Sequence, residues 1–511
     1  MKCDCSKERW GLLFKPGLAV MVIVIMLLST TSMGAEEGPV VRVEPTAMTR
    51  LYGRPATKAG AAASLDQLPE NMVIRWVGRG SISWQVDVRH SGDYEVALCY
   101  AALTSGAKLK IISRGGQSKI TSTVHKTTGP FEDRQISEEG PLHTDFLRNY
   151  ERVPLDGVLH LPAGISKLTL RVTEPESGEV MDLWAMELIP VAAKQSIAEA
   201  EERARRSQAS TDWFVEAKYG VMFHFDPHSQ PRHGPKKPYP EAIRDFDVNA
   251  FADMVEETGA GYVIFTLNHG HHNPDLNLWF APIKSWEKLH SGSTTKRDLI
   301  GEIADALGKR GIKLIIYIAS SSLLEDALSS DSISGGDDAF DAHVEILKEM
   351  GLRYGRKLAG YWFDSWDRIP QMFTNAPASF ERLFKATKTG NPDRIIALNF
   401  WIFPDATLWQ EYWAAEADEE LKPAKGRYIG YDAGRGLQRH ALFMLEGIWV
   451  HSRPNSEMEE PVFTEEELIS YVKQLTANKG VATVNLGIYQ DGTIGEKSRK
   501  LMRALRRAFG K

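Results

Sequence analysis

A carboxylate among aromatic rings is the feature of this sequence best suited to chemistry. Asp364 ends the apolar run LAGYWFD, and three aromatic residues lie beside it: Trp362, Phe363 and Trp366. Aromatic rings stack on the C–H faces of sugars, and a carboxylate can face the anomeric carbon of a glycoside. The pattern therefore predicts a carbohydrate site at Asp364. The alternative is an aspartate that only caps the segment after it.

Histidines mark two further places where apolar runs end. His224 alternates with apolar neighbours in GVMFHFD, and the run NHGHH follows YVIFTL. These side chains could bind sugar hydroxyls, although His224 could also be a satisfied core histidine. His269 and His271 could instead form the His-x-His pair of an amidohydrolase-type metal site. The later runs ALNFW and TVNLG lack the further ligands of such a site, so we predict no metal and no other cofactor.

The second half of the chain supplies elements that would position these residues. From about residue 211, apolar strand-like runs alternate with amphipathic helical patterns. Eight runs fit buried parallel strands: 220–225, 261–267, 313–319, 358–364, 394–399, 409–413, 441–449 and 481–487. They predict an α/β fold, a (β/α)₈ TIM-like barrel over 211–511. In such a barrel the functional side chains lie at the C-terminal strand ends.

Helix signals accompany this pattern. Gly259 predicts the end of one amphipathic helix, and Thr464 with Glu467 predicts a capping box before the helix that leads to the last strand. Residues 191–210 contain no glycine or proline and are rich in alanine and charge, so we expect a solvated helical linker there.

The first half shows a different period. Ile82, Trp84, Val86 and Val88 alternate with polar neighbours, and turn signals such as SGD separate such runs. The pattern predicts an antiparallel β-sandwich over 36–190. The runs SISWQVDVRHSGDYEVALCYA and LHLPAGISKLTLRV resemble galactose-binding-like jelly rolls, which are often attached to secreted carbohydrate-active enzymes. The alternative is a spacer without a ligand.

The N-terminus is typical of a secretory signal. Basic residues precede the apolar run Leu18–Leu28, and the small residues Ser29–Ala35 follow it. The run has 11 residues, whereas a spanning helix needs about 20. We expect a signal peptide over 1–34, a secreted or periplasmic protein and no stable membrane span after cleavage. A retained anchor is the alternative. Cleavage would leave Cys99 as the single cysteine, without an intramolecular disulfide.

Composition excludes several classes of protein. The 511 residues are 43% hydrophobic and 25% charged, which excludes a disordered chain, a collagen-like rod and a multi-span membrane protein. The net charge of −6, with interspersed signs, gives no footprint for nucleic acid. A carbohydrate is the expected partner, and the sequence does not fix an oligomeric state.

Several motifs taken together resemble one family. The run WFVEAKYGVMFHFD (213–226) resembles the opening of the α-L-fucosidases of glycoside hydrolase family 29. The likeness continues through four further runs along the predicted barrel: GAGYVIFTLNHGHH, KRDLIGEIADALGKRGIKLIIYI, RYGRKLAGYWFDSW and VATVNLGIYQDGTI. The family's His-Trp pair is His224-Phe225 here, and its compact His-His-Asp-Gly-Phe turn is replaced by NHGHHNPDLNLW, so we expect a divergent branch.

The resemblance implies roles for particular residues. The family's nucleophile ends the YWFD strand and falls on Asp364, and its acid/base falls on Glu416 in EYWAAEAD. Glu446 in EGIWVHS is the rival acid. The substrate-binding set predicted from the motifs is His224, His269, His271, His272, Trp279, Trp362, Trp366 and Trp449.

The resemblance implies a glycoside hydrolase that releases α-L-fucose, or a related sugar, with retention. Retention by double displacement requires the two carboxyl groups to lie about 5–5.5 Å apart. One alternative is a carbohydrate-binding homologue that has lost turnover. The other is a metal-dependent, amidohydrolase-type hydrolase that uses His269 and His271.

Overall fold

The computed structural model describes most of the chain beyond the predicted signal segment 1–34. The described residues are 40–53, 57–64, 73–113, 118–127, 150–268, 281–320, 336–366, 376–401, 403–405, 407–415, 436–477 and 479–511. Every described residue belongs to one compact unit, Gly38–Lys511. Within the described ranges, no helix has both the length and the apolar character needed to cross a membrane.

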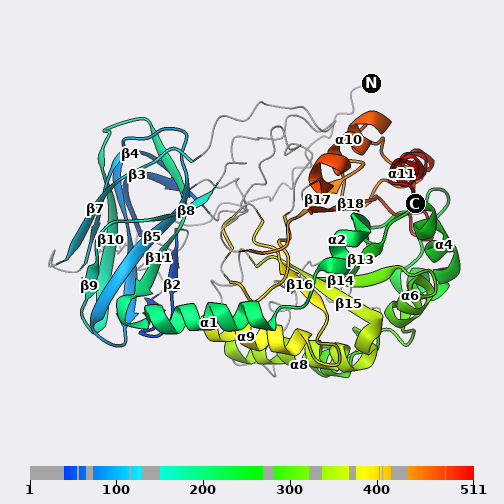
Figure 1. The fold of residues 1–511 in the computed structure, drawn as a ribbon, viewed down its shortest axis with the longest axis horizontal. Coiled ribbons are helices and arrows are strands. Elements are labelled where there is room, and N and C mark those ends of the chain that lie inside the picture. Colours follow the sequence, from blue (N-terminus) through cyan, green and yellow to red (C-terminus); the bar gives the residue numbers. More distant parts are fainter. Residues whose placement is uncertain are drawn as a thin grey trace, which may run out of the picture. The chain divides into compact units, whose positions relative to one another are not determined.

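The first half forms a network of eleven hydrogen-bonded strands, drawn in blue and cyan in Figure 1. The strands are β1 (Val40–Val43), β2 (Thr49–Tyr52), β3 (Thr57–Ser64), β4 (Ile74–Val88), β5 (Gly92–Ala101), β6 (Lys108–Ile112), β7 (Lys119–Thr123), β8 (Glu151–Pro154), β9 (Leu159–Leu161), β10 (Gly164–Glu174) and β11 (Glu179–Pro190). The longest ordered path is β7-β6-β10-β4-β11-β5-β8, and its neighbours are antiparallel. The predicted antiparallel pairing is confirmed.

The register explains the alternating pattern. Trp84 of β4 lies opposite Leu168 of β10, and Ile82 lies opposite Leu170, so apolar residues meet on one face. All four side chains are buried in one apolar core. After β11 the chain forms a short 3₁₀ turn, Val191–Ala193, and helix α1 (Lys194–Ser207), so the segment is helical as expected.

The second half forms a seven-stranded parallel sheet in the order β16-β15-β14-β13-β12-β18-β17. Its strands are β12 (Tyr219–Phe223), β13 (Tyr262–Asn268), β14 (Lys313–Ala319), β15 (Leu358–Asp364), β16 (Ile395–Leu398), β17 (His440–Met444) and β18 (Val481–Asn485). All neighbouring strands are parallel. The expected bounds of β14 and β15 agree with the structure, and those of four others agree to within two residues. Strand β17 ends five residues earlier than expected.

The expected strand at 409–413 is wrong, because side-chain oxygens of this segment, and not its backbone carbonyls, accept N–H groups of β16. The carboxylate of Glu411 accepts the N–H of Ile396 (2.8 Å), and the amide oxygen of Gln410 accepts the N–H of Leu398 (2.9 Å). A regular ladder would join those N–H groups to carbonyls instead. The segment is nevertheless held on both sides. Glu411 donates its N–H to the Ile396 carbonyl, and the Ala415 carbonyl accepts from Leu442.

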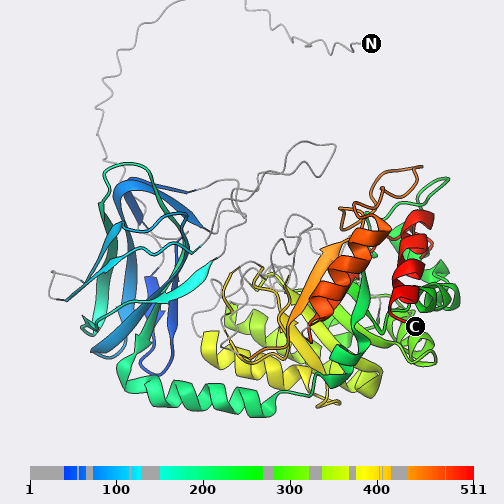
Figure 2. The same ribbon diagram turned by 45° about the horizontal axis from the view of Figure 1, so that its top comes forward.

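Helices cover one side of the parallel sheet (Figure 1). They include α3 (Tyr239–Asp245), α4 (Val248–Thr258), α5 (Lys284–Leu289), α6 (Leu299–Gly308), α8 (Gly336–Tyr354), α9 (Ala376–Thr387), α10 (Glu465–Thr476) and α11 (Glu496–Ala508). Helix α2 (Asp212–Ala217) instead packs Phe214 against the inward-facing residues Met222 and Tyr262. The predicted capping box at Thr464 is present, and Gly259 ends α4 with a φ of 73°. Helices α10 (orange) and α11 (red) pack side by side (Figure 2).

Alternate strand residues enter two different cores. On β13, Val263 and Phe265 pack with residues of the helices, whereas Tyr262 and Ile264 belong to a separate core. That inner core also takes Met222, Ile315, Trp362, Ala397 and Leu442 from five other strands. Side chains that continue the inner rows past the C-terminal strand ends therefore meet at one edge of the sheet.

Candidate active site

Asp364, the last residue of β15, accepts a hydrogen bond on each carboxylate oxygen. The Tyr317 hydroxyl of β14 donates to Oδ2 (2.7 Å), and the Asn399 amide, just after β16, donates to Oδ1 (2.8 Å). The side chain is partly buried. The two donors fix the plane of the carboxylate. The position therefore suits an oriented nucleophile or a charge stabiliser rather than a helix cap.

Tyr317 contacts both Asp364 and His224, the residue that directly follows β12. Its ring stacks on Trp362 (5.2 Å between centroids, 17° between planes) and meets the His224 ring edge-on at 5.0 Å. Trp362 is only 1% exposed. It stacks on Tyr317 and supports that ring, and its contact with substrate stays a prediction.

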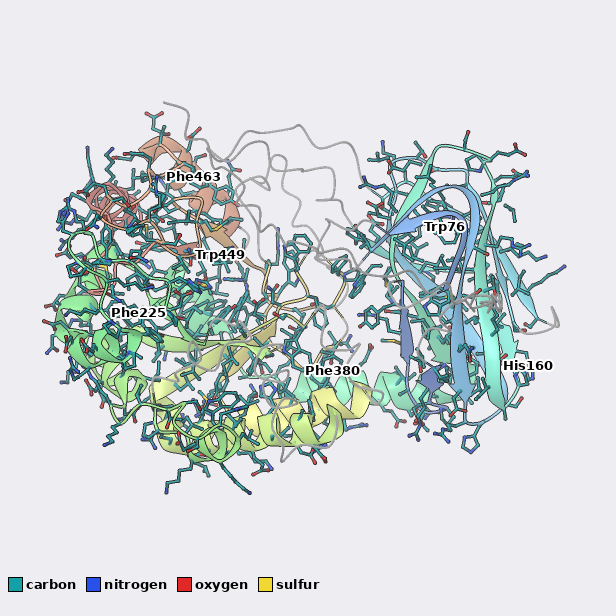
Figure 3. The ribbon with its side chains drawn as sticks, turned by 180° about the vertical axis from the view of Figure 1, so that it is seen from behind. Trp76, His160, Phe225, Phe380, Trp449 and Phe463 are labelled. Carbon is teal, nitrogen blue, oxygen red and sulfur yellow. The ribbon has the colours of Figure 1, made fainter. Side chains whose placement is uncertain are left out.

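His224 lies buried just after β12, against two other strand ends. Its Nδ1 is 3.0 Å from the amide oxygen of Asn485, the last residue of β18. The Asn485 nitrogen donates to the carbonyl of Ile448 (2.9 Å). The ring of Trp449 lies 5.0 Å from that of His224 and is partly exposed. Figure 3 shows Trp449 in the segment after β17. The structure thus brings His224 and Trp449 together, as the site prediction requires.

Trp366 lies elsewhere. Its ring packs against Phe380 of α9 (5.4 Å), and its Nε1 donates to Ser320 (3.2 Å), within the helix-side core. Figure 3 labels Phe380 on that helix. Trp366 is 2% exposed. The described structure thus places the Trp366 ring in the helix-side core, and its stacking on a sugar stays a prediction.

Five of the predicted site residues lie outside the described residues: Glu416, His269, His271, His272 and Trp279. The described chain stops at Ala415, one residue before Glu416, where it is paired with Leu442 of β17. It also stops at Asn268, the end of β13.

Glu446, the rival acid, is buried on the helix side. Its Oε2 accepts the N–H of Gly487 (3.0 Å), and Ser498 of α11 is the neighbouring side chain that favours its charged form. Burial nevertheless raises the pKa of Glu446 to about 7. A pKa near 7 suits a general acid. The contacts argue against this role: within the described part of the chain, Glu446 shares no hydrogen-bond partner with Asp364.

The raised pKa of Glu446 predicts a pH-dependent stability. Its ordinary pKa is 4.5, so the stabilisation of the folded state is complete below that pH and is lost as the pH rises through about 7. The pKa difference of about 2.5 corresponds to about 3 kcal/mol as an upper bound. We expect Glu446→Gln to remove this loss. The midpoints of urea unfolding at pH 5 and pH 8 measure this loss of stability. The control Glu345→Gln, at an exposed position, should lose as much stability between these pH values as the wild type. Parallel trends in all three proteins would contradict it.

The sequence analysis missed Tyr317, Asn399 and Asn485. Each lies in a run that was examined for other reasons: KLIIYIA, ALNFW and TVNLG. In each case a polar side chain lies near the C-terminal end of a buried strand. Asn485 is the last residue of β18, Asn399 directly follows β16, and Tyr317 lies two residues before the end of β14. Such a position faces the same edge as Asp364 when its strand belongs to the same parallel sheet.

Comparison with known proteins assigns the family. A family model described as alpha-L-fucosidase matches residues 239–507, more than half of the chain. The chain belongs to the alpha-L-fucosidase family. The matched span contains Asp364, Asn399 and Asn485 and begins after His224.

Individual relatives of the alpha-L-fucosidase family cover part of the chain. The human tissue alpha-L-fucosidase is 31% identical over 317 residues, which are 55% of this chain and 64% of the relative. The Macaca fascicularis protein of the same name is 23% identical over 323 residues, again 64% of its length. The chain thus spans just under two thirds of these relatives. The solved unliganded alpha-L-fucosidase AlfC from Lactobacillus casei aligns with 58% of this chain at 19% identity and a TM-score of 0.41.

Proposed function

We propose that this protein is a retaining α-L-fucosidase that releases α-L-fucose, or a closely related sugar, from oligosaccharides or glycoconjugates. The observation that carries the proposal is Asp364, held on both oxygens by Tyr317 and Asn399 at a strand end. The alpha-L-fucosidase family membership supports the choice of sugar. The buried His224 and the partly exposed ring of Trp449 supply hydroxyl recognition and a stacking face.

The proposed reaction has two displacements. Asp364 attacks the anomeric carbon, the bond to the leaving oxygen breaks, and Glu416 gives that oxygen its proton. Glu416 then takes a proton from water, whose oxygen attacks the same carbon and releases Asp364 as a carboxylate. The hydroxyl of Tyr317 and the amide of Asn399 orient the Asp364 carboxylate before attack and donate to it again as it departs.

We also propose the finer architecture. The segment 411–415, hydrogen-bonded to Ile396 on one side and to Leu442 on the other, would occupy the eighth strand position of a (β/α)₈ barrel over 211–511. The antiparallel strands of 36–190 would form a jelly roll, joined by the helical linker 191–210. Residues 1–34 would direct the protein to the periplasm or the medium as a signal peptide.

A panel of p-nitrophenyl glycosides tests the activity. We expect release of nitrophenol from the α-L-fucoside and little from the α- and β-glucosides, galactosides and mannosides. Proton NMR of the first product, before mutarotation, should show the α-anomer. Absence of activity on every glycoside would refute the hydrolase, and the β-anomer as first product would refute retention. Chelation by EDTA should leave the rate unchanged.

The hydroxyl of Tyr317 gives a prediction of intermediate size. Tyr317→Phe removes one of the two donors to Asp364, and a hydrogen bond to a charged group contributes about 1.5–3 kcal/mol. We therefore expect kcat/KM for the aryl fucoside to fall by about 10- to 100-fold. Tyr361→Phe is the matched control, because the buried Tyr361 hydroxyl of the neighbouring strand has no hydrogen-bond partner in the described part of the chain. Equal rates in the two variants would exclude a role for the Tyr317 hydroxyl.

A further inference from the structure

One amide links the histidine of the site to the segment that carries its tryptophan. Asn485 is fully buried, and both polar atoms of its side chain are used. Its nitrogen lies 2.9 Å from the Ile448 carbonyl, which can only accept a hydrogen bond. The amide orientation is therefore fixed, with the oxygen toward His224 Nδ1 at 3.0 Å.

This orientation determines the tautomer of His224. An amide oxygen can only accept, so Nδ1 must carry the proton that is donated to it. In the neutral imidazole the other nitrogen, Nε2, is then a hydrogen-bond acceptor. A hydroxyl group donates to such an atom, whereas an N–H donor on the ring would need an acceptor oxygen from the ligand.

The same residue also holds Trp449. Ile448, whose carbonyl Asn485 binds, directly precedes Trp449, and the Asn485 carbonyl accepts the N–H of Leu445 at the base of the same segment (3.0 Å). The Trp449 ring lies 61° to the plane of the His224 ring at 5.0 Å. Loss of the amide would release both sides of this contact.

We propose that Asn485 is a positioning residue of the sugar site: it fixes His224 as a hydrogen-bond acceptor at Nε2 for a sugar hydroxyl and holds Trp449 beside it. The sugar as ligand rests on the proposed function, whereas the tautomer does not. A residue that acts only on stability would leave the tautomer and the balance between KM and kcat unchanged.

The test combines NMR and kinetics on the full chain. Spectra of ¹⁵N-histidine-labelled protein give the tautomer of His224, whose signals are assigned by their absence in His224→Gln. We expect the wild type to carry the proton on Nδ1, Asn485→Leu to show both tautomers, and Asn485→Asp, which keeps an acceptor, to retain the wild-type form. For Asn485→Leu we also expect KM for the aryl fucoside to rise about 10- to 100-fold, with a smaller change in kcat.

Asn391→Leu is the matched control. Asn391 is also buried and also uses both atoms, with the Leu358 carbonyl and the Asp393 N–H, but at the N-terminal end of β15. It should destabilise the fold without raising KM. A wild-type proton on Nε2, or equal KM values in the two leucine variants, would overturn the proposal. A wild type that lacks fucosidase activity but carries the proton on Nδ1 would refute the proposed function and leave the assignment of Asn485 as the residue that orients His224.

Discussion

Asp364→Ala should lower kcat for p-nitrophenyl α-L-fucoside by about 10⁴-fold or more, because the proposed mechanism assigns the covalent intermediate to Asp364. The variant also leaves a space where the carboxylate was, lined by the donors Tyr317 and Asn399. Added azide should enter that space and restore part of the rate. Its attack replaces the first displacement alone, so the product should be β-L-fucosyl azide, with inverted configuration. Steady-state kinetics with and without azide, and NMR of the product, measure both effects.

The control for this prediction is another aspartate outside the site. Asp305 is half-exposed and pairs with Lys357 at the surface, so Asp305→Ala should retain wild-type kinetics. Near-normal activity of Asp364→Ala would remove Asp364 from the mechanism. Thermal melting shows whether Asp364→Ala is folded. Loss of the two hydrogen bonds costs about 1–3 kcal/mol of stability, so we expect the variant to remain folded at the assay temperature.

Apolar runs located the parallel strands because a strand buried on both faces is apolar throughout. The expected bounds of β14 and β15 match the structure for this reason. The same signal failed where apolar residues are buried outside the ladder. Leu445 is fully buried, yet its N–H bonds to the Asn485 carbonyl and the chain leaves β17 at Met444. Hydrophobicity reports burial and does not report the hydrogen-bond partner.

The carboxylate of the site was predictable and most of its partners were not. Asp364 ends its own apolar run, so one segment of sequence contains the whole signal. Tyr317 and Asn399 reach it from strands 47 and 35 positions away, and only the register of the sheet brings them to the two carboxylate oxygens.

Trp366 shows why residues flanking a strand are placed poorly by sequence. Its spacing from Asp364 continues the row that faces the site. The backbone at Ser365 is left-handed, however, with a φ of 67°, and the chain turns there toward α9. A non-glycine residue in that region is uncommon and is imposed by its surroundings, so local sequence gives no sign of it.

Glu416→Ala should give the second large effect, and its size should depend on the leaving group. An acid that protonates the departing oxygen contributes about 10²- to 10⁴-fold when the leaving group is a sugar hydroxyl. A dinitrophenolate leaves without a proton, so cleavage of that fucoside should lose far less. The limb of the pH–rate profile that reports the protonated acid should also disappear. Rates on a fucosyl disaccharide and on the dinitrophenyl fucoside, measured from pH 4 to pH 9, test this.

Glu446→Gln is the decisive comparison, because the family resemblance favours Glu416 as the acid/base whereas the raised pKa favours Glu446. The pKa of Glu446, raised to about 7 by burial, would suit a general acid. Its carboxylate, however, contacts Gly487 and lies beside α11, whereas the donors around Asp364 come from β14 and from the residue after β16. We therefore expect Glu446→Gln to lose similar small factors on both substrates. A loss confined to the disaccharide in Glu446→Gln, with none in Glu416→Ala, would transfer the acid/base role to Glu446.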